Sequence, residues 1–112
     1  MRSYISLNEN KDFLRLYYRG KSVAAPSLVV YAKKNPFGQV RMGITTGKKI
    51  GNAVERNRSR RIIRAAFDRV TTERTIKGGW DIVLVARTKT RTKKSGALYN
   101  VMIDAFTKLG VI

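Results

Sequence analysis

The chain of 112 residues contains no cysteine and no histidine. It therefore cannot form a disulfide, and it lacks a thiol nucleophile, an imidazole base and the usual zinc ligands. Its seven carboxylates are spread along the chain, and no two are spaced as a metal site or an acid–base pair requires. A self-sufficient enzyme, such as a protein nuclease, is disfavoured. We expect no catalytic residue and no metal ligand in this chain, and any catalysis would come from something that it binds.

Long apolar segments are also absent. No stretch is long enough to span a bilayer, and the N-terminus carries no hydrophobic signal. We therefore expect a cytoplasmic protein without a membrane partner. A hydrophobic content of 43% suits one modest core, and no repeat or linker divides the sequence. Residues 1–112 are expected to form a single domain.

Acidic residues are few compared with basic ones. Lys and Arg total 24 against 7 Asp and Glu, which gives a formal net charge of +17. Such an excess makes a folded chain repel itself, and a partner that supplies neutralising anions relieves that repulsion. A basic protein without a membrane segment most often binds nucleic acid.

The positive charge is concentrated between residues 48 and 64, KKIGNAVERNRSRRIIR. The basic side chains are Lys48, Lys49, Arg56, Arg58, Arg60, Arg61 and Arg64, and only Glu55 opposes them. Asn52 is placed to cap a helix that runs to about Thr72, with apolar residues at helical spacing. A solvated helix face would normally alternate Glu with Lys, so an anion-binding surface is the stronger interpretation. Arginine binds phosphate in a bidentate manner, and RNA is the first candidate.

Hydrophobic periodicity and turn residues predict five further elements. The expected segments are a helix over 11–19 capped by Asn10 and stopped by a left-handed Gly20, a hairpin of strands over 27–34 and 39–46, a buried strand over 80–87, and a last helix from a Ser95 cap to Gly110.

Two further groups of residues have open alternatives. Phe13 and Tyr17 share a helix face, and Val29 and Tyr31 share a strand face, so all four could line a cleft. Aromatic rings beside a basic helix can stack the bases of single-stranded nucleic acid, but the same rings suit a core equally well. The basic residues Arg87, Lys89, Arg91, Lys93 and Lys94 form either a second RNA contact or a solvated loop.

The run from Lys48 to Arg64 resembles the signature of the bacterial ribonuclease P protein subunit, whose centre is an Arg-Asn-Arg motif, here Arg56, Asn57 and Arg58. The resemblance extends over nearly the whole chain. It includes Asp12-Phe13, Gly20, Tyr31, Met42-Gly43-Ile44 and the segment 81–87.

The resemblance implies an α+β fold, a two-layer αβββαβα sandwich with a four-stranded sheet. It also implies a left-handed βαβ crossover through the long helix, against the general preference for right-handed ones. The family's catalytic centre lies in a large RNA subunit, which uses Mg²⁺ to remove the 5′ leader of precursor tRNA. The implied partners are therefore the ribonuclease P RNA and precursor tRNA, with no small-molecule substrate.

The resemblance also assigns residues. Phe13, Tyr17, Val29 and Tyr31 match positions of the cleft that holds the leader. The positions that face the RNA are matched by Lys48, Lys49, Asn52, Arg56, Asn57, Arg58, Arg60, Arg61 and Arg64. The alternative function is a non-catalytic basic RNA-binding module, of a ribosomal or RNA-chaperone-like kind, for which the charge is equally suitable.

Overall fold

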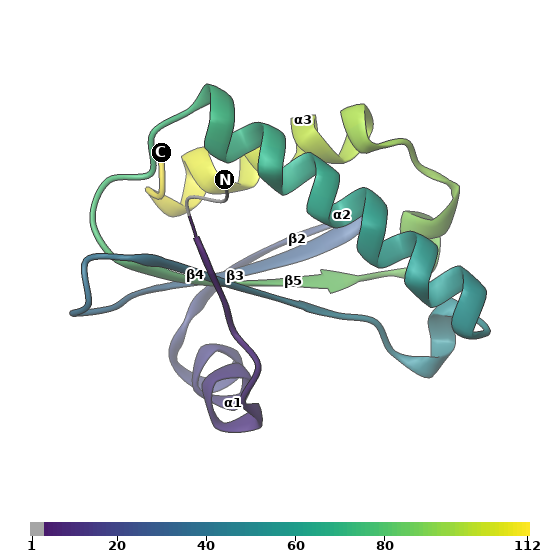
Figure 1. Ribbon diagram of the computed structural model, residues 1–112, viewed down its shortest axis with the longest axis horizontal. Helices are drawn as coiled ribbons and strands as arrows, with labels where there is room; N and C mark the ends of the chain where they lie inside the picture. Colours follow the sequence, from purple (N-terminus) through teal and green to yellow (C-terminus); the bar gives the residue numbers. More distant parts are fainter. Residues whose placement is uncertain (1–3) are drawn as a thin grey trace.

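A five-stranded sheet with helices on both faces forms the molecule, as a computed structural model of residues 4–112 shows (Figure 1). The strands are β1 (Ile5–Ser6), β2 (Lys21–Ala25), β3 (Leu28–Lys34), β4 (Val40–Thr45) and β5 (Trp80–Ala86). The helices are α1 (Asn10–Arg19), α2 (Ala53–Glu73) and α3 (Ser95–Leu109), with the 3₁₀ turns η1 (Lys48–Ile50) and η2 (Thr88–Thr92). The expected α+β class is confirmed.

The sheet has five strands where the sequence analysis expected four. The additional strand, β1, has two residues and pairs with β4 in parallel. A two-residue strand is too short to show an alternating pattern, so the sequence gives no sign of it.

The expected hairpin of β3 with β4 is wrong. The order across the sheet is β1-β4-β5-β3-β2, so β5 lies between these two strands. β5 is buried along almost its whole length, and an apolar strand of this kind gains most from a central position. The hairpin partner of β3 is instead β2. The family resemblance implies a third strand before the long helix, but the residue patterns did not locate it, because the segment KSVAA is short, partly polar and at the sheet edge.

β4 and β5 are parallel neighbours joined through α2, which makes a βαβ crossover. In Figure 1 both strands run toward the right, β5 lies behind β4, and α2 lies above them. This arrangement is left-handed, as the family resemblance implies and against the usual preference.

The main core lies between the sheet and the pair α2 and α3. Alternate residues of β4, Val40, Met42 and Ile44, are buried there, as the alternation of the strand predicts. Phe67 of α2 and Phe106 of α3 meet edge to face, with ring centroids 6.0 Å apart. The two helices therefore form one layer that covers a single face of the sheet.

α1 covers part of the opposite face, so helices lie on both sides rather than in the two layers expected. Leu16 of α1 packs there with Leu7 and Val83 in a second, smaller core. Figure 1 shows α1 alone below the sheet. The part of this face that α1 leaves uncovered is the floor of the cleft described below.

Three expected helix ends differ in detail. Asn10 and Ser95 are the first residues of α1 and α3 rather than caps, and no side chain caps either helix. Gly20 has extended backbone (φ −78°), not the left-handed conformation expected. A glycine is needed there because a Cβ would lie 2.6 Å from the carbonyl oxygen of Leu16. Gly110 ends α3, as expected, and has the left-handed conformation.

Tyr4, which precedes β1, contacts one flank of α2. Its ring meets Phe67 edge to face at 4.9 Å, and its hydroxyl donates a hydrogen bond to Asp68. Helical periodicity alone places Asp68 and Arg64 opposite the apolar stripe, yet both are half-buried in the fold. In the part of the chain from residue 4 onward, no helix is long and apolar enough to cross a membrane.

Candidate nucleic-acid interface

The basic segment begins with a well-defined helix start. Asn52 accepts a hydrogen bond from the backbone of Glu55 at 2.9 Å, and the Glu55 carboxylate accepts one from the backbone of Asn52 at 3.3 Å. This capping box fixes the first turn of α2. Gly51 has φ +134°, and a Cβ there would lie 2.2 Å from the Glu55 carboxylate, so only glycine fits. The predicted cap is confirmed, and it sets the direction in which the following arginines point.

The basic side chains of this segment are without acidic partners. Among the residues from Tyr4 to Ile112, none of the seven Lys and Arg between 48 and 64 forms an ion pair. Lys48, Lys49, Asn57 and Arg61 are exposed, and Arg56 and Arg64 are half-buried. The surface therefore carries a high density of positive charge that no carboxylate of the protein neutralises.

Two of these arginines make contacts to backbone carbonyls. Arg60 donates to the carbonyl of Ile44 at 3.2 Å, which ties α2 to the end of β4. Arg58 donates to the carbonyl of Arg91 in η2. Each contact uses one guanidinium nitrogen and leaves the positive charge in place, so both side chains keep donors for a phosphate.

The four residues predicted to line a cleft lie together. The rings of Tyr17 and Tyr31 meet edge to face with centroids 5.0 Å apart, although they belong to α1 and β3. Phe13 packs against the same small core, and Val29 is half-buried on the same strand face. Tyr17 keeps 37% of its surface exposed. These rings pack on the sheet and still present surface to solvent, so base stacking by them stays a prediction.

Val85 and Gly43 belong to this cleft but were missed by the sequence analysis. Val85 lies directly across from Val29 in the sheet and is half-buried. A Cβ on Gly43 would lie 2.5 Å from the Phe13 ring, so the ring rests directly on the strand backbone. The apolar run of β5 does not reveal which residues face the cleft; only its register against β3 does.

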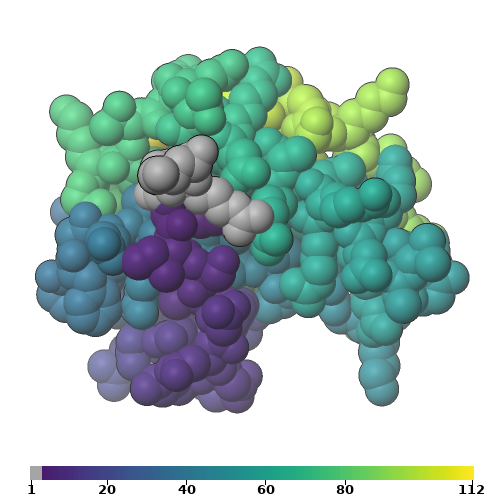
Figure 2. Space-filling model, in the orientation of Figure 1, coloured from purple at the N-terminus to yellow at the C-terminus, as the bar shows by residue number. Residues whose placement is uncertain are grey.

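The cleft continues toward the basic segment. A groove at the carboxyl ends of β4 and β5 is lined by Thr45 and Val85 on the cleft side and by Lys48 and Lys49 on the other. Figure 2 shows α1 projecting below the body of the molecule, with open space between it and the segment that leads into α2. Val85, directly across from Val29, therefore joins the aromatic residues to the groove that holds the two lysines.

The basic loop after β5 is not simply solvated. Arg87 donates to the carbonyl of Ala25 at 3.1 Å. Arg91 donates to the carbonyl of Ile50 and to the carboxylate of Glu55, both at 3.0 Å. Lys89, Lys93 and Lys94 are exposed. Of the five residues predicted as a second contact, two hold the loop against the rest of the fold and three remain available.

The buried carboxylates of Asp12 in α1 and of Asp81 in β5 both lie close to the guanidinium of Arg41. Arg41 donates to both oxygens of Asp81, at 2.8 and 2.7 Å, and its guanidinium lies 4.0 Å from Asp12. The hydrogen bonds to Asp81 raise the pKa of Arg41 above its usual value. Among the residues that the structure describes, no three His, Cys, Asp or Glu side chains gather as a metal site.

The fold and this surface are typical of a small α+β nucleic-acid-binding domain. It has an aromatic cleft beside an arginine-rich helix. The chain belongs to the ribonuclease P protein family, whose family model, Ribonuclease P, matches residues 1–110.

The relatives agree with this assignment. The chain is 42% identical over 85 residues to the ribonuclease P protein component of Clostridioides difficile, covering 76% of this chain and 74% of that one. It is 32% identical over 105 residues, 94% of each chain, to the component of Clostridium botulinum. The structure of the Staphylococcus aureus RNase P protein superposes with a TM-score of 0.80 at 31% identity, over 98% of each chain.

Proposed function

We propose that this chain is the protein subunit of a ribonuclease P, which binds a catalytic RNA and the 5′ leader of precursor tRNA. The observation that carries the proposal is the groove that joins Val85, opposite Val29 of the aromatic cleft, to the unpaired Lys48 and Lys49 of η1. The cleft suits unstacked bases and the basic surface suits phosphates. Both together fit a single-stranded leader held next to a structured RNA.

The catalytic centre is proposed to lie in the RNA partner. The protein offers no histidine or cysteine, and Arg41 engages the carboxylates of Asp12 and Asp81 next to the cleft. Mg²⁺ is proposed as the metal, bound mainly by the RNA and the substrate, because a hydrated divalent ion is commonly held by phosphate oxygens. The proposed role of the protein is to neutralise phosphates and to position the leader. With precursor tRNA as the substrate, the proposed location is the cytoplasm.

Reconstitution tests this proposal. The chain is mixed with a ribonuclease P RNA subunit and precursor tRNA at a low Mg²⁺ concentration, at which the RNA alone cleaves slowly. We expect the protein to raise the rate of 5′ leader removal. Cleavage no faster than with RNA alone would contradict the proposal.

Substrate preference distinguishes a ribonuclease P subunit from a general RNA-binding module. A ribonuclease P subunit should make the assembled complex bind precursor tRNA with a leader more tightly than mature tRNA. A general module should bind both equally. The comparison needs only the two RNAs and one equilibrium binding assay at fixed salt, since affinity for RNA depends steeply on salt.

A further inference from the structure

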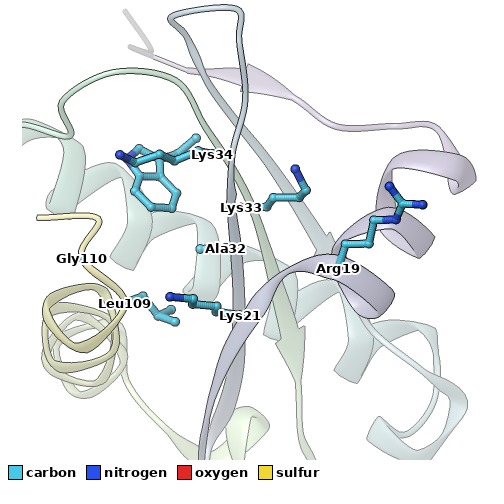
Figure 3. Close-up of a pocket in the computed structure, with 8 residues that line it drawn as sticks. Arg19, Lys21, Ala32, Lys33, Lys34, Leu109 and Gly110 are labelled. Carbon is cyan, nitrogen blue, oxygen red and sulfur yellow. The ribbon is translucent and has the colours of Figure 1, made fainter.

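A second basic surface lies at the opposite end of β5 from the start of α2. It is a hollow lined by Arg19 at the end of α1, Lys21 at the start of β2, and Lys33 and Lys34 at the end of β3 (Figure 3). The end of α3, at Gly110, closes one side. Sequence separation hides this cluster, because its four cations come from three different elements.

None of the four cations has an acidic partner. Within residues 4–112 no ion pair involves Arg19, Lys21, Lys33 or Lys34. Asp81 lies directly across from Lys33 in the sheet, but Arg41 and Asn35 already bind its oxygens.

The remaining negative contribution at this surface is small. The C-termini of α1 and α3 each carry a negative partial charge of about half an elementary charge, against four formal positive charges. The hollow therefore carries uncompensated positive charge, as the start of α2 does.

The sheet edge is open at this place. The pairing of β2 with β3 ends at Lys21 and Ala32, and β3 runs on to Lys34. Lys33 and Lys34 therefore lie beyond Lys21, the first residue of β2, and have no paired strand on that side. Lys34 also lies over the ring of Trp80, with its ammonium 5.7 Å from the ring centroid, which holds the long side chain near the hollow. Lys33 and Lys34 belong to a strand, so their backbone is already ordered when a phosphate binds.

This surface is too far from the first one to share a phosphate with it. Lys34 pairs with Trp80 at one end of β5, whereas the groove with Lys48 and Lys49 lies at the other end, by Ala86. Six residue steps of about 3.3 Å separate the ends by roughly 20 Å. That is about twice the screening length at 0.1 M salt, so each surface attracts its own phosphates.

The hollow lies at one end of the sheet and draws on both of its faces. Ala32, Trp80 and Leu109 belong to the core between the sheet and α2 and α3. Arg19 belongs to α1, and Lys33 shares the strand face of Val29 and Tyr31. The distance along β5 therefore separates this surface from the start of α2, and a large structured RNA can reach both.

We propose that the surface of Arg19, Lys21, Lys33 and Lys34 binds the phosphate backbone of the RNA subunit at a second place, remote from the start of α2. This rests on the proposed function, because it takes the RNA subunit as the partner. The protein would then bridge two segments of one RNA and hold them at a fixed separation.

A pair of triple variants tests this inference. One variant removes the exposed cations of the hollow: Arg19→Gln, Lys21→Gln and Lys34→Gln. The control removes three exposed cations elsewhere: Lys11→Gln, Arg74→Gln and Lys77→Gln. Both lower the net charge equally, and circular dichroism checks that both fold. Binding to the RNA subunit alone is measured over a range of KCl concentrations.

We expect the hollow variant to lower the slope of log K against log[salt] by roughly 2 units, since each lost phosphate contact removes about 0.7 to 0.9. The control should change the slope much less. Equal slopes in the two variants would overturn the inference.

A second arm distinguishes the RNA subunit from the leader. In the assembled complex, the hollow variant should keep the wild-type preference for precursor over mature tRNA. Loss of that preference would place the leader, not the RNA subunit, on this surface and overturn the assignment. Failure of the proposed function is separate, because it appears as wild-type protein that does not stimulate cleavage.

Discussion

At the level of single residues, Gly43 controls the position of Phe13, one of the four residues predicted to line the cleft. Replacing Gly43 with Ala puts a Cβ 2.5 Å from the Phe13 ring and 3.2 Å from Leu7, so the ring must move away. We expect a loss of about 1 to 3 kcal/mol in the free energy of unfolding, the usual cost of overpacking. Urea denaturation measures this loss, and leader binding should weaken with it.

Gly96→Ala is the matched control for this substitution. Position 96 lies in the first turn of α3, and nothing lies within 4 Å of its added Cβ. Alanine is also the better helix former, so this variant should be as stable as the wild type or slightly more stable. If the Gly43→Ala protein is as stable as the Gly96→Ala protein, close packing of the Phe13 ring on Gly43 does not contribute to stability, and the prediction is wrong.

Tyr17 is the residue that best separates base stacking from core packing. It retains 37% exposure while its ring touches Tyr31, so truncation should cost little stability. If a leader base stacks there, Tyr17→Ala should weaken precursor binding by about 1 to 3 kcal/mol and leave binding of mature tRNA unchanged. Tyr17→Phe keeps the ring and should bind like the wild type. Equal weakening for precursor and mature tRNA would assign the ring a structural role.

At the level of elements, η2 is held against the start of α2 by Arg91. Its guanidinium reaches the Ile50 carbonyl and Glu55, and Glu55 also completes the cap of α2. Arg91→Ala should therefore lower the melting temperature of the free protein, because it removes two charge-assisted hydrogen bonds. Each such bond contributes at most about 1.5 to 3 kcal/mol to the free energy of unfolding. Differential scanning calorimetry without RNA measures the change.

Lys93 provides the contrast in the same loop. It is exposed and forms no ion pair in the described chain, so Lys93→Ala should leave the melting temperature unchanged. If it contacts phosphate, its loss should lower the salt slope of RNA binding by nearly one unit. A slope equal to that of the wild type would make this part of η2 a solvated loop, the alternative that the sequence left open.

At the level of the whole molecule, a net charge of +17 opposes folding. Added salt screens this repulsion, so the free protein should become more stable between low salt and about 0.3 M KCl. A gain of about 1 kcal/mol would raise the melting temperature by about 4 to 8 °C in a domain of this size. A melting temperature that falls with salt would mean that the few ion pairs outweigh the repulsion. Sulfate and phosphate buffers are avoided in this measurement, because bound anions would add their own stabilisation.

Features that depend on near neighbours could be predicted from residue patterns alone. The cap at Asn52, the length of α2, the buried strand from Trp80 and the left-handed end at Gly110 all follow from residues within a few positions of one another. The same is true of the basic segment, whose charge and Arg-Asn-Arg motif are contiguous. Helix geometry and strand alternation are local, so a sequence pattern specifies them.

Only the tertiary structure decided which distant segments meet. The insertion of β5 between β3 and β4, the pairing of Val29 with Val85 and the contact of Tyr17 with Tyr31 are long-range. Strand order and register depend on how the whole apolar surface is best covered, which no local pattern encodes. The cleft, the anchoring of η2 and the second basic surface all arise from this step, because each draws its residues from elements far apart in the chain.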